Sequence, residues 1–359
     1  MKNNNENKIL NVPNLRFPEF SGEWENCQIA NILSIGSGRD YKHLEKGNIP
    51  VFGTGGYMTS VNECIYDGET TFIGRKGSIN KPFYYNGKFW TVDTLFYTHS
   101  FNKTTPKFVY CLFQTINWLR YNEASGVPSL SKDTIEKIKV FIPQLDEQRK
   151  ISEMLSVIDE RIATQNKIIE DLKKLKSAIY QEIFSNLQGE ECSLLDLAEI
   201  IKGQQINGSE LSDSGKYYVM NGGIAPSGYY DSYNTEADTI SISEGGNSCG
   251  YVQYNSSEFW SGGHCYTLRI KPTSSIATHF LFHYLKWKEP DIMALRIGSG
   301  LPNIQKKDLS KISIIVPTLD KQLQLTVLLS AFKKKIENEE MYVANLDKQK
   351  QYLLQQMFI

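Results

Sequence analysis

A long stretch of this chain occurs twice, first at residues 142–184 and again at residues 316–358. The matching positions keep a constant spacing of 174 without a gap (317 − 143 = 174), and they include Pro143 and Pro317, Leu145 and Leu319, Asp146 and Asp320, Gln148 and Gln322, and Phe184 and Phe358. A duplication of this length means that the same local structure has to form twice. The sequence therefore predicts two like modules in one chain.

Within each copy, apolar residues recur at alternating steps of four and three, which is the heptad pattern of a coiled coil. The first seam comprises Ile151, Leu155, Ile158, Ile162, Ile169, Leu172, Ile179 and Ile183. The second comprises Leu325, Leu329, Phe332, Ile336, Val343, Leu346, Leu353 and Met357. Both seams have one polar residue at the same place, Gln165 and Glu339.

A helix of about 40 residues is roughly 60 Å long, and a narrow apolar seam needs a partner that covers it. The two copies are each other's obvious partner, so we expect them to pack as an antiparallel pair. Pro143 and Pro317 are expected in the first turn of each helix, where a missing N–H group leaves no bond unmade. A coiled coil that only dimerises two chains is the simpler alternative.

The regions before the two helices also share one plan of short strands, glycine turns, a short helix and a proline loop. Residues 50–56 match 217–223, residues 71–85 match 239–254, and residues 125–143 match 299–317. The predicted fold class is α+β, with two homologous mixed α/β domains separated by two long helices that form an antiparallel coiled coil with approximate twofold symmetry. The predicted segments are 1–142 (first domain), 143–187 (central helix), 188–316 (second domain) and 317–359 (second helix).

Composition sets limits on function. The 359 residues are enough for two domains, and they carry a net charge of −1. Residues 1–142 have 16 Lys and Arg against 13 Asp and Glu (+3), whereas residues 192–317 have 10 against 12 (−2). If the chain holds DNA, we expect other subunits to supply much of the phosphate neutralisation. The six cysteines form no CxxC pair, so neither a zinc ribbon nor a disulfide framework is indicated.

Two further expectations concern location. Residues 1–11 have the composition of an unstructured segment rather than of a secretory signal, and no run approaches the ~20 apolar residues of a membrane helix. We therefore expect a cytoplasmic protein without a membrane partner. Two like modules joined by helices suit a partner with two half-sites, and DNA is such a partner, with about 34 Å between successive helical turns.

Several motifs resemble one known family. The segments LRFPEFSGEW (residues 15–24), IGRKG (73–77), SGVPSLS (125–131), SGLPNIQ (299–305), IPQLDEQRKI (142–151) and VPTLDKQLQL (316–325) resemble the specificity subunit of type I restriction-modification systems. The resemblance covers nearly the whole chain. One departure is Lys321, which stands where the first junction has Glu147, and it indicates two unequal halves.

This resemblance implies two target recognition domains that each read one half of a bipartite double-stranded DNA site. The helices are then expected to set the spacing and to dock two methyltransferase subunits. The resemblance also implies restriction subunits as partners. The cofactors S-adenosylmethionine, ATP and Mg²⁺ are expected on those partner subunits and none in this chain.

The candidate DNA-contacting residues lie in loops of the two domains. Arg75 and Lys76 follow a strand and stand between glycines, where a turn could direct them to a guanine edge or a phosphate, although a solvated hairpin tip is an equal alternative. In the matching loop, Glu244 could accept a hydrogen bond from cytosine and Asn247 could pair with adenine. The first domain's candidates are Arg39, Tyr41, Lys42, Arg75, Lys76 and Ser129. The second domain's candidates are Gln204, Gln205, Asn207, Ser243, Glu244, Asn247 and Asn303.

No catalytic motif is evident. The sequence lacks the phosphate-binding pattern GxxxxGK[ST]. His279 and His283 have the i, i+4 spacing of a zinc site, but Phe280 stands where a metalloprotease has its glutamate, so both are interpreted as core or surface histidines. Trp90 and Trp260 occupy equivalent strand positions and are expected in the core.

Two other classes of protein remain as alternatives. A glycan-binding fibre would fit the 20 Tyr and 17 Phe, but it predicts export. A nuclease or methylase that acts without partners would need the motifs that the chain lacks. We therefore expect a protein without enzyme activity of its own.

Overall fold

The computed structural model describes residues 11–298 and 300–359. The chain divides into two compact units. Unit 1 holds the described residues up to Asn166 together with Met341–Ile359, and unit 2 holds Lys167–Glu340. The expectation of an unstructured stretch at residues 1–11 lies outside the described residues, except for Asn11. Within the described ranges, no helix is long and apolar enough to cross a membrane.

Unit 1 is built around one sheet of six strands in the order β2-β7-β5-β6-β3-β4. Its strands are β1 (Glu25–Gln28), β2 (Ser34–Ser37), β3 (Lys46–Gly53), β4 (Gly56–Val61), β5 (Tyr66–Gly74), β6 (Phe83–Thr91), β7 (Leu95–His99) and β8 (Lys139–Ile142). Its helices are α1 (Ile29–Ile32), α2 (Pro106–Thr115), the short 3-10 helix Trp118–Tyr121 and α3 (Lys132–Glu136). Strands β1 and β8 form a separate pair beside the start of the long helix. Helix α2 begins at Pro106, and the Thr105 side chain caps its N-terminus by accepting a hydrogen bond from Phe108 N.

Unit 2 has the same plan, but its sheet is divided. Its strands are β9 (Glu190–Ser193), β10 (Ala198–Lys202), β11 (Tyr217–Met220), β12 (Gly228–Tyr230), β13 (Thr239–Ser243), β14 (Val252–Asn255), β15 (Trp260–Ser261), β16 (Cys265–Ile270) and β17 (Ser313–Val316). Its helices are α5 (Leu194–Leu197), the 3-10 helix Gly208–Glu210, α6 (Thr278–Trp287), α7 (Glu289–Ala294) and α8 (Lys306–Leu309). The sheets run β10-β16-β13-β14, β12-β11-β15 and β17-β9.

The division of the unit 2 sheet occurs at one strand. In unit 1, β6 pairs with β5 along most of its length and with β3 through Val51 and Trp90 near its end, so one strand joins both halves of the sheet. In unit 2, β14 pairs with β13 and β15 pairs with β11, and the residues between Asn255 and Trp260 are outside any strand. The two domains therefore keep the same strand order on either side of this break.

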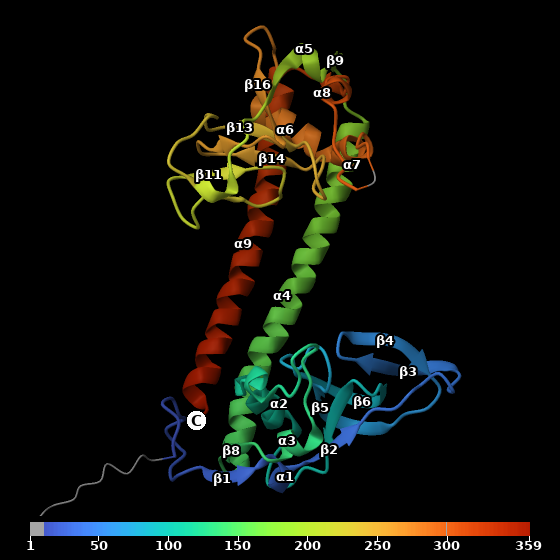
Figure 1. Cartoon of the computed structure of the whole chain (residues 1–359), viewed down its shortest axis with the longest axis vertical. Coiled ribbons are helices and arrows are strands. Elements are labelled where there is room, and N and C mark those ends of the chain that lie inside the picture. Colours follow the sequence, from blue (N-terminus) through green and yellow to red (C-terminus); the bar gives the residue numbers. More distant parts are fainter. Residues whose placement is uncertain (1–10, 299) are drawn as a thin grey trace, which may run out of the picture. The chain divides into compact units, whose positions relative to one another are not determined.

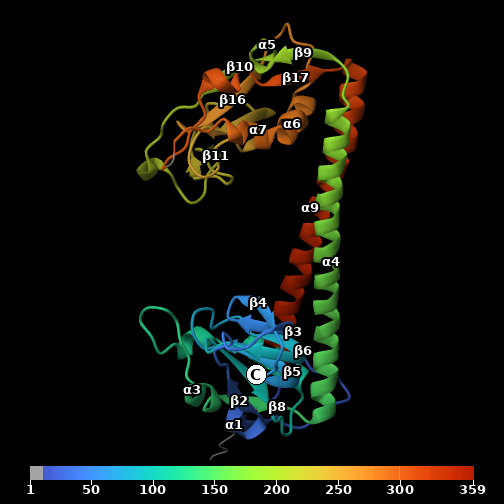
Figure 2. The ribbon, with the colours of Figure 1, turned by 90° about the vertical axis from the view of Figure 1, so that its right-hand side faces the viewer.

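Two long helices complete the units. Helix α4 spans Leu145–Ser185 and α9 spans Leu319–Met357. In unit 1 the first part of α4 packs with the last part of α9, because Ile151 and Leu155 share a core with Leu354 and Met357. In unit 2 the last part of α4 packs with the first part of α9 (Figures 1 and 2), since the unit's core includes residues of both. The pairing is antiparallel in each unit.

The predicted heptad seams are confirmed. All sixteen residues assigned to them from the sequence are buried or half-buried. Gln165 and Glu339, the polar positions of the two seams, are half-buried as well. Within each unit, residues of the two seams share one core, so the duplication supplies its own coiled-coil partner.

The prediction that Pro143 and Pro317 lie in the first turn of the long helices is wrong. The first hydrogen bonds of the long helices run from Gln148 N to Gln144 O and from Gln322 N to Thr318 O, each 3.0 Å. Pro143 therefore precedes the cap residue of α4, outside the first turn, and Pro317 does so for α9. The reason is that each proline carbonyl accepts a hydrogen bond from the buried glutamine five residues later.

The departure at Glu147 has a structural counterpart. The Glu147 carboxylate is buried and accepts two hydrogen bonds from the Arg16 guanidinium, at 2.8 and 2.7 Å. The Trp24 indole donates to the same carboxylate at 3.3 Å. Glu147 thereby fixes the segment before β1 to the start of α4. Lys321, at the equivalent place in α9, is exposed.

Candidate nucleic-acid interface

Two tryptophans hold equivalent loops in the two units. The Trp90 indole donates a hydrogen bond to Arg39 O, and the Trp260 indole donates one to Gln204 O, each at 3.0 Å. Trp90 is in the core as predicted, whereas Trp260 is half-buried and packs edge-on to Tyr230. The loops that follow β2 and β10 therefore start from the same anchored position.

A glycine precedes the anchored residue in each unit. A Cβ atom on Gly38 would lie 2.0 Å from Val92 O, and one on Gly203 would lie 2.2 Å from Gly262 O. No side chain fits at these distances, because the loop passes directly over the neighbouring backbone. Glycine is thus required at both places, and the chain direction there is fixed.

Beyond this anchor the candidate side chains differ. Arg39 and Lys42 are exposed, whereas Tyr41 is half-buried and packs against Val51, Val61 and Trp90. In unit 2, all three candidates of this loop are exposed: Gln204, Gln205 and Asn207. The Asn207 amide donates to Glu210 at 2.8 Å, which orders the loop locally.

A second pair of equivalent loops follows β5 and β13. Arg75 N donates to Thr94 O at 2.8 Å, and Glu244 N donates to His264 O at 2.9 Å. The carbonyl of Arg75 accepts from Leu130 N, and that of Glu244 accepts from Ile304 N. Arg75 and Glu244 therefore occupy the same backbone position, so the structure places an arginine in one unit where the other has a glutamate.

The proline loops lie against these positions in both units. Lys76 pairs with Ser129 in one isolated β-bridge, and Gly245 pairs with Asn303 in another. Ser129 is half-buried and Asn303 is exposed. The structure thus brings the candidates of the strand loop and of the proline loop together within each unit.

In unit 1 these residues line a cleft of about 540 Å³. Arg75 and Lys76 are exposed on its wall, and the Arg75 guanidinium lies 5.9 Å from the Phe96 ring centre and donates to Asp93 O at 3.3 Å. Lys132, which no sequence motif indicated, also lines the cleft. On the same wall, hydrogen bonds from Thr134 and Ser131 lower the pKa of Glu123.

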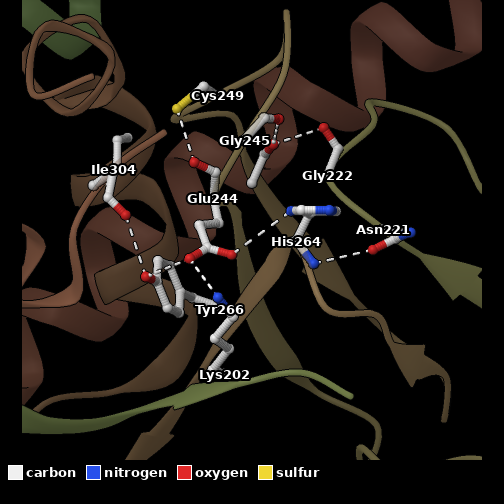
Figure 3. Close-up of polar contacts among 10 residues, drawn as sticks. Lys202, Asn221, Gly222, Glu244, Gly245, Cys249, His264, Tyr266 and Ile304 are labelled. Atoms are coloured by element: carbon white, nitrogen blue, oxygen red, sulfur yellow. Dashed lines mark hydrogen bonds and ion pairs between the residues drawn. The ribbon is translucent and has the colours of Figure 1, made fainter. Parts of the chain in front are cut away.

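In unit 2 the Glu244 carboxylate stands at the equivalent position and points toward Lys202, Tyr266 and His264 (Figure 3). Glu244 is only 7% exposed, and its Oε1 accepts hydrogen bonds from Lys202 Nζ at 2.7 Å and from Tyr266 OH at 2.9 Å. Its Oε2 lies 4.0 Å from His264 Nδ1 and has no hydrogen-bond partner among the described residues. Burial and the bond to Glu244 raise the pKa of Tyr266.

Ser243 also faces inward. It is buried, and its hydroxyl donates to Gly222 O at 2.7 Å. Before either Ser243 or Glu244 could contact a base, its side chain would have to break these hydrogen bonds. The exposed groups beside them are Asn247, Lys202 and His264.

Lys202 and His264 were missed by the sequence analysis. Lys202 ends β10 and His264 precedes β16, so they meet only because β10 and β16 are neighbours in the sheet. The repeat did not point to Lys202 or His264, because unit 1 has Ser37 and Thr94 at the corresponding positions.

The arrangement offers hydrogen-bond donors, acceptors and cations. Within the described chain, no group of three or more His, Cys, Asp or Glu side chains could hold a metal ion. His283 is a core residue whose ring nitrogens contact Tyr180 OH at 2.6 Å and Ser330 Oγ at 3.1 Å, and His279 is exposed and packs on Tyr254. The two histidines thus play separate structural roles.

Comparison with known proteins identifies one family along most of the chain. The family model described as "Type I restriction modification DNA specificity domain" matches residues 21–174 and again residues 188–345. A protein of Mycoplasma pneumoniae named as a type I specificity subunit is 35% identical over 147 residues, which is 41% of this chain and 39% of that protein. A similarly named protein of Mycoplasma genitalium is 30% identical over 155 residues, 43% of this chain and 40% of that protein. The match thus spans about two fifths of each relative's length.

A solved structure shows the same fold over nearly the full length. The crystal structure of a type I restriction-modification S subunit from Mycoplasma genitalium superimposes with a TM-score of 0.72 and 19% identity, covering 97% of this chain and 99% of that one. Two copies of the family's domain are therefore present here, and each match extends into one of the long helices. The chain belongs to the family of type I restriction-modification DNA specificity proteins and contains two target recognition domains.

Proposed function

We propose that this chain is the DNA-reading subunit of a type I restriction-modification enzyme. Each domain reads one half of a bipartite site in double-stranded DNA, and the paired helices set the spacing between the halves. Two methyltransferase subunits dock on the chain and methylate adenines, and restriction subunits cleave DNA in an ATP-dependent reaction. The chain itself has no catalytic role.

The observation that carries this proposal is the exchange of side chains on equivalent loops. Arg75 and Glu244 stand at one backbone position, and Arg39 and Gln204 stand at another. Arginine pairs with guanine in the major groove and glutamine with adenine, whereas the buried Glu244 leaves Lys202 and His264 as the exposed groups beside it. A common scaffold with different polar groups is what two different half-sites require.

The site residues then have unequal roles. We propose that Arg39, Lys42, Arg75 and Lys76 contact DNA from unit 1, and that Gln204, Gln205, Asn207, Asn247 and Asn303 do so from unit 2. Lys202, paired with Glu244, adds a cation to unit 2, and His264 adds an exposed imidazole beside it. Tyr41, Ser243 and Glu244 support these loops from within.

Docking of the methyltransferase subunits is supported by the outer faces of the long helices. Both helices expose large apolar side chains that the seams do not use. These residues are Leu145, Val157, Ile168 and Leu175 of α4 and Leu319, Leu323, Val327 and Met341 of α9. Exposed apolar groups of this kind are typical of protein interfaces.

The partners supply the cofactors. S-adenosylmethionine belongs to the methyltransferase subunits, and ATP with Mg²⁺ belongs to the restriction subunits. With a net charge of −1, this chain depends on its partners for much of the phosphate neutralisation. The complex acts on DNA in the cytoplasm, and no membrane partner is involved.

The proposal is tested by mapping N6-methyladenine. The chain is expressed with its methyltransferase subunit in a host free of such methylation, and genomic DNA is sequenced by a single-molecule method. The expected result is one bipartite motif with a fixed unread gap. A stable complex that leaves no bipartite methylation would contradict the proposal, and methyl transfer by the chain alone would contradict its non-catalytic role.

A further inference from the structure

The duplication reveals a charge reversal between the two units. In unit 1, Lys350 of α9 pairs with Asp159 of α4 at 2.5 Å, with the lysine side chain 9% exposed. The constant spacing of 174 relates Lys350 to Lys176 and Asp159 to Lys333. The lysine is thus kept in unit 2, where Lys176 is half-buried, but a second lysine replaces its carboxylate partner.

Lys176 has no substitute for the missing carboxylate. Three neighbouring lysines each have one: Lys173 pairs with Glu340 at 2.6 Å, Lys286 with Glu289 at 2.5 Å, and Lys333 with Glu337 at 3.7 Å. No carboxylate of the described chain lies within ion-pair distance of Lys176. Burial, and then the charges of Lys286 and Lys333, lower the pKa of Lys176, and the charges of Glu337 and Glu289 offset part of this effect.

A cavity of about 570 Å³ opens beside these lysines, where α6 and α7 lie next to α4 (Figure 2). It is lined by four lysines (Lys173, Lys176, Lys286 and Lys333), by the three carboxylates that pair with the other lysines (Glu289, Glu337 and Glu340) and by the rings of Tyr180 and Trp287. The Trp287 ring stacks on Phe184 and its indole donates to Gln181 at 3.0 Å, which fixes this wall.

The equivalent pocket of unit 1 has no charged side chain in its lining. It measures about 300 Å³ and is lined by Gln114, Thr115, Gln351, Leu354, Gln355, Phe358 and Ile359. Gln351 and Leu354 correspond to Ser177 and Tyr180 by the spacing of 174. Lys333 is therefore a property of unit 2 alone, whereas Lys176 has a counterpart in Lys350 of unit 1.

We propose that the unit 2 pocket binds a small oxyanion, a carboxylate or a phosphate, at the place that the Asp159 carboxylate occupies in unit 1. A partly buried cation is stabilised by an opposite charge within hydrogen-bond distance, and such bonds are about twice as strong as neutral ones. The aromatic wall of Tyr180 and Trp287 accommodates an apolar or flat part of the same ligand. This site is separate from the DNA-reading loops and does not depend on the proposed function.

The test uses the full chain and two probes, sodium pyrophosphate and sodium citrate, at an ionic strength matched with chloride. Each probe's affinity is measured by calorimetry, and its effect on the melting temperature is measured in parallel. Binding of pyrophosphate alone identifies a phosphate ligand, and binding of citrate alone identifies a carboxylate ligand. Failure of both probes to bind overturns the proposal.

Variants locate the site. Lys176→Gln is expected to weaken binding at least tenfold. Lys333→Asp rebuilds the unit 1 ion pair, so it should abolish binding while melting no lower than the wild type in chloride. Lys334→Gln, which removes an exposed charge from the same turn of α9, is the matched control and should bind as the wild type does. Undiminished binding by Lys176→Gln or Lys333→Asp would place the anion elsewhere and overturn the assignment.

Discussion

The side chain of Gln322 makes the same kind of contacts in unit 2 as Gln148 makes in unit 1. Gln148 Nε2 donates to Pro143 O and to Lys103 O, both at 2.8 Å, and its Oε1 accepts from Thr105 N at 3.1 Å. Gln322 Nε2 donates to Pro317 O at 2.9 Å and to Ser275 O at 3.0 Å. Its Oε1 accepts from the backbone N–H of Ala277, the N-cap residue of α6, at 2.8 Å. Both glutamines are fully buried. They tie each long helix to the short helix of its own domain.

Gln148→Ala should therefore destabilise unit 1, and Gln322→Ala should destabilise unit 2. Each change leaves several buried backbone groups without partners, which costs on the order of 3 kcal/mol. Urea denaturation measures the loss, and hydrogen exchange shows whether α2 or α6 is affected. The exposed neighbour Gln144 provides the control, and a loss no greater than that of Gln144→Ala would disprove the anchoring role.

Trp90→Phe should loosen the loop that follows β2, because it removes the bond to Arg39 O and keeps most of the ring. The expected effect is about 1 kcal/mol of local stability, seen as faster hydrogen exchange of residues 39–44. Trp118→Phe removes a similar buried bond, to Phe113 O, away from this loop. If residues 39–44 exchanged equally fast in Trp90→Phe and Trp118→Phe, Trp90 would not hold the loop.

Arg75→Gln should weaken DNA binding by the assembled complex. If the guanidinium contacts a phosphate, the slope of log affinity against log salt should fall by about 1; if it contacts a base, discrimination at one position should fall by about 1–3 kcal/mol. Arg120 is exposed outside the cleft, so Arg120→Gln serves as the control. Wild-type affinity and specificity in Arg75→Gln would remove this residue from the interface.

His283 makes unit 2 sensitive to acid. Burial, and then the charges of Lys176, His279 and Lys333, lower the pKa of His283 from 6.5 to about 4. The unfolded chain then takes up a proton below pH 6.5 that the folded chain refuses until about pH 4, so stability is lost as the pH falls through this window. Between pH 7 and pH 5 the loss should be about 2 kcal/mol.

The measurement for His283 is urea denaturation at pH 7 and pH 5. His283→Gln should lose less stability than the wild type over this interval, whatever its stability at pH 7. His279→Gln removes one of the smaller causes of the lowered His283 pKa and leaves the buried imidazole in place, so most of the wild-type pH dependence should remain. An unchanged pH dependence in His283→Gln would refute this account.

The long helices could be predicted from the sequence because their signal is periodic. Every predicted seam residue, from Ile151 to Met357, is buried or half-buried, since the spacing of four and three allows one solution for a helix pair. The helix starts were less accessible. The sequence could not show that the side chains of Gln148 and Gln322 would bond to the proline carbonyls, because the other bonding partners of these glutamines lie more than forty residues away in the chain.

The reading loops could be located but not oriented. Constant motif order identified Arg75 and Glu244 as members of matching loops, and the structure places them at one backbone position. The burial of Glu244 could not be predicted, because it depends on Lys202 and Tyr266, which approach only when β10, β16 and β13 pair. The base contacts proposed for the exposed candidates remain predictions.

The central claim is that each domain reads one half of the DNA site. The most direct measurement replaces residues 192–317 with the corresponding segment of a specificity subunit of different sequence preference, and maps N6-methyladenine in cells that also express the methyltransferase subunit. The account predicts that one half of the bipartite motif changes while the other half and the gap stay the same. A change in both halves, or in neither, would contradict it.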